Sequence, residues 1–251
     1  MRPSRHVLCT LLLASCTPSQ EAAHVRLAVA VDGAQLVDTV SDLGYTVHLD
    51  TARLAIGDLG FTIRGEMHGA TASLWRYLVP TAWAHPGHYA GGDVTGELPG
   101  AFVLDFLMGD GATLGEAELI VGDYNGCNID LRRADELPDA DPLRGHTAYF
   151  AGTATKDGVA LAFTAALDVD AGVQVVGAPF EDTVGVDSQG PLRLQMIAHD
   201  PIENLTLFDG LDFAALDDDG DGAVAIVPGD AAHNIFRRAI QSHVFYYVVA
   251  P

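Results

Sequence analysis

Two histidines separated by a turn-forming dipeptide are the residues of this chain whose spacing best suits metal chemistry. His85 and His88 flank Pro86-Gly87. Proline presets the backbone at the second position of a β-turn, and glycine accepts the positive φ of the third position in a type II turn. The two histidines then begin and end one turn, with Cα atoms within roughly 7 Å. This turn predicts a site for a transition metal such as copper or zinc.

The segment around this turn contains further residues that favour a metal site. Residues 65–100 hold both tryptophans, Trp75 and Trp83, and another histidine, His68. Long loops are uncommon between strands and often carry function. We therefore interpret 65–100 as a metal-binding insertion, with exposed histidines in an ordinary turn as the alternative.

A ligand from outside the turn decides which metal the site suits. Two histidines from one turn plus one from elsewhere would suit copper, whereas zinc normally takes four ligands. The candidates for the additional ligand are His68, His146 and His199. His146 precedes a predicted strand, and His199 follows one.

A second motif predicts a calcium site. Asp217, Asp219 and Asp221, followed by Gly222, match positions 1, 3, 5 and 6 of a calcium loop. Val224 suits the apolar position 8. Any calcium bound here is expected to be structural, holding the turn before the last helix. A solvated acidic turn is the alternative, because runs of like charge usually face water.

The calcium motif is incomplete at its end. Position 12 of such a loop is normally a bidentate glutamate, and here it is Pro228. Asp230, at the start of a predicted helix, is the candidate replacement.

The N-terminus has the pattern of an export signal. Arg2 and Arg5 precede an apolar run over residues 7–14, which is too short to cross a bilayer, since a spanning helix needs about 20 residues. The run ends in Leu13-Ala14-Ser15-Cys16, which resembles the lipobox of bacterial lipoproteins. That resemblance implies removal of residues 1–15, lipidation of Cys16 and, since Thr17 follows, sorting to the outer membrane. An ordinary signal peptide cut nearby is the alternative.

The charge of the chain restricts its partners. It has 13 Lys and Arg against 34 Asp and Glu, a net charge of −21. Nucleic acids and anionic lipids bind clustered basic residues, so neither is an expected partner beyond the lipid anchor itself. Cations are attracted instead.

Cysteine usage excludes a disulfide within the exported chain. Cys9 leaves with the signal and Cys16 carries lipid, so Cys127 stands alone. A lone cysteine is usually a small buried hydrophobe, with a soft metal ligand or a reactive thiol as the alternative.

Hydrophobic patterning predicts a mainly β protein, an antiparallel β-sandwich with a long metal-binding loop insertion and a short C-terminal helix. We expect a tether at 16–23 and one domain at 24–251, with a distinct subregion at 200–251. The helix is expected over 230–243, with Asp230 as its N-cap. Lys156-Asp157-Gly158 signals a hairpin. The expected strands are 24–31, 45–49, 53–56, 59–63, 102–106, 116–121, 147–154, 159–167, 172–176, 192–198 and 244–249.

The Trp83-x-His85 motif on an exported β-rich chain resembles the copper-binding surface and periplasmic proteins of methanotrophs. This family includes the methanobactin-associated periplasmic protein and the MopE/CorA-type proteins. The resemblance implies that Trp83 can be oxidised to kynurenine and that a dihaem peroxidase-like enzyme is a partner. It also implies a distant ligand histidine, for which His146 has the appropriate separation, ahead of His68 and His199. The chain departs from the family in having few cysteines and a histidine-rich metal loop.

Three functions stay open on these grounds. The first is a lipid-anchored copper protein for metal acquisition, storage or handover. The second is a surface adhesion or scaffold lipoprotein with a structural calcium loop, and the third is a zinc-dependent enzyme. The chain contains no His-Glu-x-x-His, no Gly-x-Ser-x-Gly and no glycine-rich phosphate loop. We therefore expect a binding protein rather than an enzyme.

Overall fold

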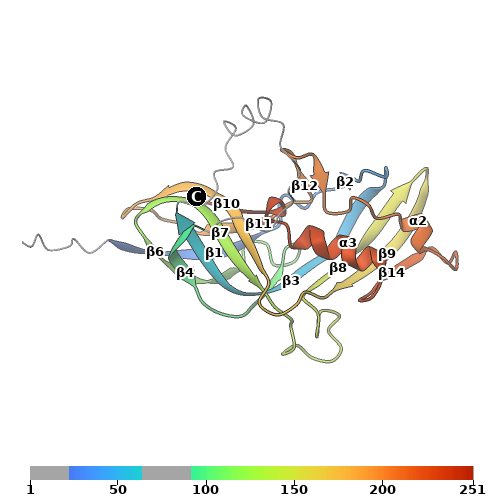
Figure 1. Ribbon diagram of the computed structural model, residues 1–251, viewed down its shortest axis with the longest axis horizontal. Helices are drawn as coiled ribbons and strands as arrows, with labels where there is room; N and C mark the ends of the chain where they lie inside the picture. Colours follow the sequence, from blue (N-terminus) through green and yellow to red (C-terminus); the bar gives the residue numbers. More distant parts are fainter. Residues whose placement is uncertain (1–22, 64–91, 251) are drawn as a thin grey trace, which may run out of the picture.

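The computed structural model describes residues 23–63 and 92–250, which are mainly β-structure (Figure 1). Most strands join one large sheet, and β12 and β13 form a small separate one. The strands of the first half are β1 His24–Asp32, β2 Thr39–Val40, β3 Thr46–Ile63, β4 Asp93–Leu98, β5 Phe102–Asp105, β6 Thr113–Ile120 and β7 Gly122–Leu131. Those of the second half are β8 Ala148–Lys156, β9 Val159–Leu167, β10 Gln174–Val184, β11 Leu192–Met196, β12 His199–Asp200, β13 Leu205–Thr206, β14 Ala223–Ile226 and β15 Tyr246–Val249. The helices are α2 Phe213–Leu216, α3 Ala231–Ile240 and the 3-10 turn η1 His243–Phe245.

Strand β3 organises the sheet because it is long enough to pair with strands on both sides and at both ends. Its 18 residues pair with β2 and β8 near the start, with β5 in the middle, and with β4 and β7 towards the end. The register against β8 shifts between Leu49 and Thr51, and the register against β7 shifts between Ile56 and Leu59. Such bulges bend and twist a strand, so β3 can serve both halves of the molecule.

The second half of β3 belongs to a two-layered part of the molecule, at the left in Figure 1. From β3 the sheet runs through β4, β6, β1, β11 and β15 in one direction, and through β7 to β10 in the other. Strand β15 packs against β10, which brings the two ends of this path together. Buried aromatic rings fill the interior, where Phe180 lies 5.9 Å from Phe61 and 5.3 Å from Tyr124 between ring centroids.

The first half of β3 continues into β8, β9 and β14, and helices cover one face of these strands (Figure 1). Phe236 of α3 lies 4.9 Å from Phe150 of β8, and Phe213 of α2 lies 5.1 Å from Phe163 of β9, between ring centroids. Phe236 and Ile240 lie one helical turn apart on the buried face of α3. Most buried apolar residues of both halves form one contiguous core, and Ala55, Ala134 and Leu143 form a small separate cluster under the loop between β7 and β8.

The predicted fold class is confirmed: the chain is mainly β, with the layers of a sandwich and a short C-terminal helix. Strand β9 has the predicted bounds, and its hairpin to β8 turns at Asp157 and Gly158, with φ of 51° and 80°. These values suit the type I′ turn that right-twisted strands favour. Asp230 precedes α3 as predicted, but its side chain makes no cap bond to the helix and instead accepts a hydrogen bond from the backbone N–H of Val227 at 3.2 Å.

Several predicted strand limits are wrong. The sequence predicts three short strands over residues 45–63, whereas residues 46–63 form the single strand β3. The prediction fails because Asp50 and Gly57-Asp58, which resemble turn residues, lie at the two bulges. The sequence also predicts that a strand ends just before Gly122 and that a turn follows, whereas Gly122 is the first residue of β7. It also places residues 93–98 in the insertion loop, whereas they form β4 and pair with β3 and β6.

The sheet is mixed rather than wholly antiparallel. Most neighbouring strands run antiparallel as predicted, but β11 runs parallel to β1 and β14 runs parallel to β9. Alternation of apolar residues shows that a segment is a strand, but it carries no information about the direction of its neighbour.

Gly152 is required where β8 passes the first bulge of β3. A Cβ at this position would lie 2.0 Å from the carbonyl oxygen of His48. We predict that Gly152→Ala lowers the free energy of unfolding by about 2 kcal/mol, because the paired backbones must move apart. Urea denaturation measures the loss, and Gly122→Ala is the control, since nothing lies within 4 Å of its added Cβ. Equal midpoints for the two variants would contradict this account of the bulge.

Candidate metal centres

The predicted histidine turn lies outside the described residues. His68, Trp83, His85 and His88 all fall within 64–91, and the predicted lipidation site Cys16 falls within 1–22. These predictions therefore stay hypotheses based on sequence. Within the described part of the chain, no helix has the length and apolarity needed to cross a membrane.

His146 is the predicted copper ligand whose surroundings the structure describes, on the loop between β7 and β8. Its Nδ1 lies 2.7 Å from Oδ1 of Asp168, and the other carboxylate oxygen lies 3.2 Å from Nη2 of Arg133. A carboxylate accepts the Nδ1 proton and so leaves the lone pair on Nε2, an arrangement that commonly orients metal-binding histidines. Among the described residues, however, His146 belongs to no group of three close ligands.

A second histidine, which the sequence did not single out, contacts the backbone of the same aspartate. Nε2 of His233 accepts a hydrogen bond from the N–H of Asp168 at 3.0 Å. Burial in α3 lowers the pKa of His233, against the opposing effect of the Asp168 carboxylate. The ring is therefore neutral near pH 7 and fastens α3 to the end of β9. Helical spacing alone gives no sign of this role.

Two arginines hold the loop between β7 and β8 in place. Arg53 of β3 donates to both carboxylate oxygens of Asp141, at 2.8 and 3.1 Å. Arg132, at the start of the loop, donates from Nε to the carbonyl of Ile56 in β3 at 2.8 Å and pairs with Glu136 of the same loop at 2.6 Å. The hydrogen bond from Arg53 lowers the pKa of Asp141 below its ordinary value. The acidic loop is thereby anchored to the central strand.

The other candidate ligands engage different partners. His199 is exposed in β12, and its Nε2 lies 3.2 Å from Oδ1 of Asn204. Cys127 is fully buried in β7, and burial raises the pKa of its thiol. Since the thiolate is the reactive and metal-binding form of cysteine, Cys127 is the small buried hydrophobe that the sequence favoured.

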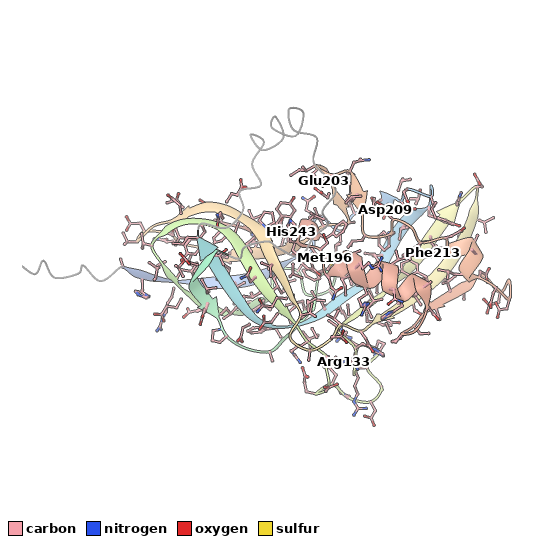
Figure 2. All side chains as sticks on the ribbon, viewed as in Figure 1. Arg133, Met196, Glu203, Asp209, Phe213 and His243 are labelled. Carbon is pink, nitrogen blue, oxygen red and sulfur yellow. The ribbon has the colours of Figure 1, made fainter. Side chains whose placement is uncertain are left out.

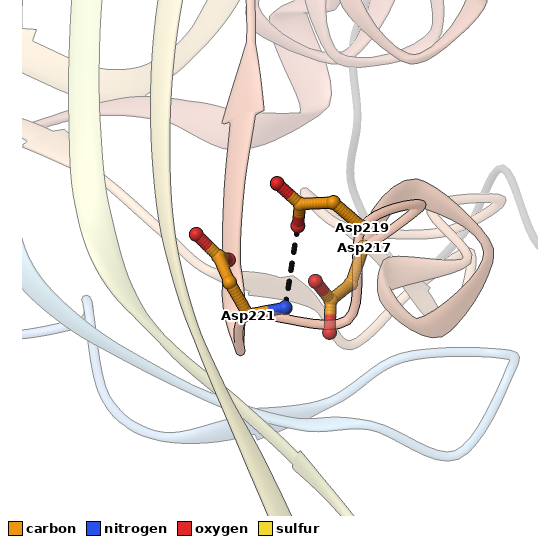
Figure 3. A group of neighbouring side chains, drawn as sticks. All are labelled: Asp217, Asp219 and Asp221. Carbon is orange, nitrogen blue, oxygen red and sulfur yellow. Dashed lines mark hydrogen bonds between the residues drawn. The ribbon is translucent and has the colours of Figure 1, made fainter.

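The three aspartates of the predicted calcium loop converge in the structure (Figure 3). Asp217, Asp219 and Asp221 each offer one oxygen within 4.8 Å of the other two. The loop joins α2 to β14 at the edge of the sheet. Among residues 23–63 and 92–250, these aspartates are the one group of three or more acidic, histidine or cysteine side chains whose ligand atoms lie close enough together to hold one metal ion.

Backbone hydrogen bonds fix the shape of this loop. Oδ1 of Asp219 accepts from the N–H of Asp221 at 3.2 Å (Figure 3), and both oxygens of Asp217 lie 3.3 Å from the nitrogen of Gly222. Gly222 has a φ of 84°. That left-handed conformation suits the invariant glycine at position 6, which makes the sharp turn of a calcium loop.

The donor atoms of the loop fit a hard cation. Calcium takes oxygen ligands from carboxylates, carbonyls and water, and three carboxylates this close repel one another unless a cation lies between them. The structure does not supply the bidentate ligand of position 12. Pro228 occupies that position. Asp230 does not belong to the group of converging aspartates, and its carboxylate accepts a hydrogen bond from the backbone N–H of Val227.

Comparisons with known proteins identify no relative. No protein-family model, no curated protein and no solved structure matches this chain. The resemblance to methanotroph copper proteins therefore rests on the Trp83-x-His85 motif, and functional conclusions come from the residues themselves.

The Arg53–Asp141 ion pair predicts a pH-dependent contribution to stability. Because the folded protein lowers the pKa of Asp141, the pair stabilises the fold above the ordinary carboxyl value of 3.8, and this stabilisation is lost as the pH falls through the lowered value. We predict that Asp141→Asn lowers the free energy of unfolding by about 1 kcal/mol at neutral pH and much less in strong acid.

Urea unfolding at the two pH values tests this difference. Asp139→Asn is the matched control, because Asp139 pairs with Arg144 on the same loop but is 88% exposed. An equal loss for Asp141→Asn at both pH values would contradict the assigned role.

Proposed function

We propose that this chain is an exported, lipid-anchored binding protein whose C-terminal part is fastened by a calcium ion in the 217–222 loop. In this proposal it serves as a surface adhesion or scaffold protein rather than as an enzyme. The observation that carries the calcium site is the convergence of oxygens from Asp217, Asp219 and Asp221 within 4.8 Å. The conformation of Gly222 and the net charge of −21 support it, since a strongly negative surface concentrates cations.

The proposed ion has a structural role because of what the loop connects. Phe213 of α2, just before the loop, is buried against the sheet, and Val224 of β14, just after it, is buried as well. A cation shared by the three carboxylates would remove their mutual repulsion and fix the end of α2 relative to β14. Export brings the protein to compartments where calcium is plentiful enough for a weak, partly hydrated site.

Calcium is predicted to stabilise the fold through this loop. Binding to the folded state alone adds about 2.7 kcal/mol to the free energy of unfolding when the free calcium concentration is a hundred times the Kd. We predict this gain for the wild-type protein and its loss in Asp217→Asn/Asp219→Asn. Thermal unfolding with and without calcium, together with calorimetric titration, provides the measurement.

The control for this prediction comes from the same loop. Asp218 lies between two of the proposed ligands but outside the converging group, so Asp218→Asn removes one charge without removing a ligand. Calcium is expected to stabilise Asp218→Asn almost as much as wild type. If calcium stabilises Asp217→Asn/Asp219→Asn as much as it stabilises Asp218→Asn, the stabilisation comes from general charge screening and the proposed site is rejected.

Copper binding for acquisition, storage or handover is a second candidate function. The observation that favours it is the hydrogen bond from His146 Nδ1 to Asp168, which leaves Nε2 to bind a metal. The His85 and His88 turn supplies the other expected ligands. Kynurenine at Trp83 and a dihaem peroxidase-like partner belong to this candidate through the family resemblance.

Copper affinity is predicted to depend on the aspartate that orients His146. We expect His85→Ala to abolish binding and Asp168→Asn to weaken it by about tenfold or more, because an orienting carboxylate also raises the basicity of its histidine. Titration of tag-free protein against a chromophoric Cu(I) chelator measures both. His24→Ala is the control, since His24 is exposed and pairs with Glu118 at 3.2 Å. Wild-type affinity in Asp168→Asn would remove His146 from the ligand set.

A further inference from the structure

A recess in the surface of the large sheet is lined by residues from four neighbouring strands. Strands β4, β3, β7 and β10 lie side by side in this order, in the left half of Figure 1. Gly60 of β3 pairs with Glu97 of β4 on one side and with Asn128 of β7 on the other. Asp130 of β7 pairs with Gln174 of β10. All five residues line the recess, which encloses about 230 Å³.

The absence of a side chain at Gly60 keeps the middle of the recess open. A Cβ at this position would lie 3.5 Å from Cγ1 of Val94 and 3.9 Å from the Cβ of Asn128, which is ordinary van der Waals contact. The backbone of Gly60 does not have the positive φ that favours glycine. Glycine inside a strand often marks a place where a ligand approaches the backbone closely. A larger residue at position 60 would therefore fill the recess without straining the strand.

Three carboxylates line the recess, and their hydrogen-bond partners are uncharged. They belong to Asp58, Glu97 and Asp130. The N–H of Gly100 donates to Oδ1 of Asp58 at 2.7 Å, and the side-chain amide of Gln174 donates to Oδ1 of Asp130. Because neither donor carries a charge, both carboxylates keep their negative charge and have a second oxygen that can accept from a ligand.

No lysine or arginine of residues 23–63 and 92–250 forms an ion pair with these carboxylates. Arg132, just beyond the end of β7, pairs with Glu136. Arg133, which Figure 2 labels on the loop between β7 and β8, pairs with Asp168. Arg26 of β1 pairs with a glutamate of β6. The nearby basic side chains are thus engaged elsewhere, and the negative charge of the recess is available to a cation from solution.

The arrangement of the carboxylates suits an extended organic cation better than one metal ion. The oxygens of Asp58, Glu97 and Asp130 do not converge within 4.8 Å, as those of the 217–222 loop do. Val94, which is 48% exposed, and Pro99 add apolar surface between the charges. Such surface packs against methylene groups while charged groups next to them stay polar contacts. The volume is below the roughly 300–1,000 Å³ of pockets for drug-sized ligands, so the recess fits a smaller molecule.

We propose that this recess binds a linear polyamine, a small cation whose ammonium groups are joined by methylene chains. The ammonium groups donate to the carboxylates of Asp58, Glu97 and Asp130, and the methylene chain lies over Gly60 against Val94. The net charge of −21 raises the concentration of such a cation near the protein. The site is separate from both metal centres, because none of their proposed ligands lines the recess.

The test measures binding of spermidine to the full chain by isothermal titration calorimetry at about 0.15 M salt, where weak long-range attraction is screened. Calcium is present throughout, so that spermidine competes with an inorganic cation. Glu97→Gln/Asp130→Asn removes two charges from the recess, and Gly60→Val fills the recess without changing its charge. The matched control is Glu116→Gln/Asp187→Asn, which removes two exposed carboxylates outside the recess. Butylamine, which has a single ammonium group, is the control ligand.

The expected result is a loss of binding that is specific to the recess. Wild type and the control variant should bind spermidine alike. Glu97→Gln/Asp130→Asn and Gly60→Val should each bind it at least about tenfold more weakly, which corresponds to about 1.4 kcal/mol. Butylamine should bind wild type more weakly than spermidine does. Near-ultraviolet circular dichroism establishes that each variant is folded.

The proposal is overturned if wild type does not bind spermidine, or if Glu97→Gln/Asp130→Asn binds it as tightly as the control variant does. In the second case the acidic surface attracts any polyvalent cation. Unchanged binding in a folded Gly60→Val variant would show that the cation lies outside the recess. Equal affinity for butylamine and spermidine would assign the recess to a single ammonium group, such as a lysine side chain of another protein.

Discussion

Backbone hydrogen bonding along β3 is the constraint on which the rest of this structure depends. One strand of 18 residues forms ladders with β2, β4, β5, β7 and β8, so it belongs to both halves of the molecule. A strand of this length can do so because its two bulges let the chain bend. Close approach of the β8 backbone at Gly152 makes the first bulge possible. The layered half and the helix-covered half therefore share one core.

The two candidate metal centres depend on this framework in different ways. The loop that carries His146 is anchored to β3 by the ion pair between Arg53 and Asp141. The aspartate loop is anchored through β14, which pairs with β9 and so, through β8, with β3. Both centres lie on a strongly acidic protein, where a bound cation relieves repulsion as well as satisfying its ligands. Metal binding and stability of the C-terminal part are therefore linked in this account.

Structural features that depend on a few neighbouring residues were predictable from the sequence. Features that depend on contacts between residues far apart in the chain were not. The Asp157-Gly158 turn, the helix after Asp230 and the converging aspartates each follow from local spacing. The continuity of β3 was missed because bulge residues resemble turn residues until their partners are known. The hydrogen bond from His146 joins residues 22 positions apart, and that from Asp168 to His233 joins residues 65 apart, so no short motif announces either. The histidine turn at His85 and His88 stays a prediction.

Anomalous diffraction from crystals grown with calcium tests the proposal that three aspartates of one loop share a calcium ion. One anomalous peak is expected within about 2.3–2.6 Å of an oxygen from each of Asp217, Asp219 and Asp221, with waters or carbonyls completing the shell. If the loop is well ordered at saturating calcium and no such peak is found, the calcium site does not exist.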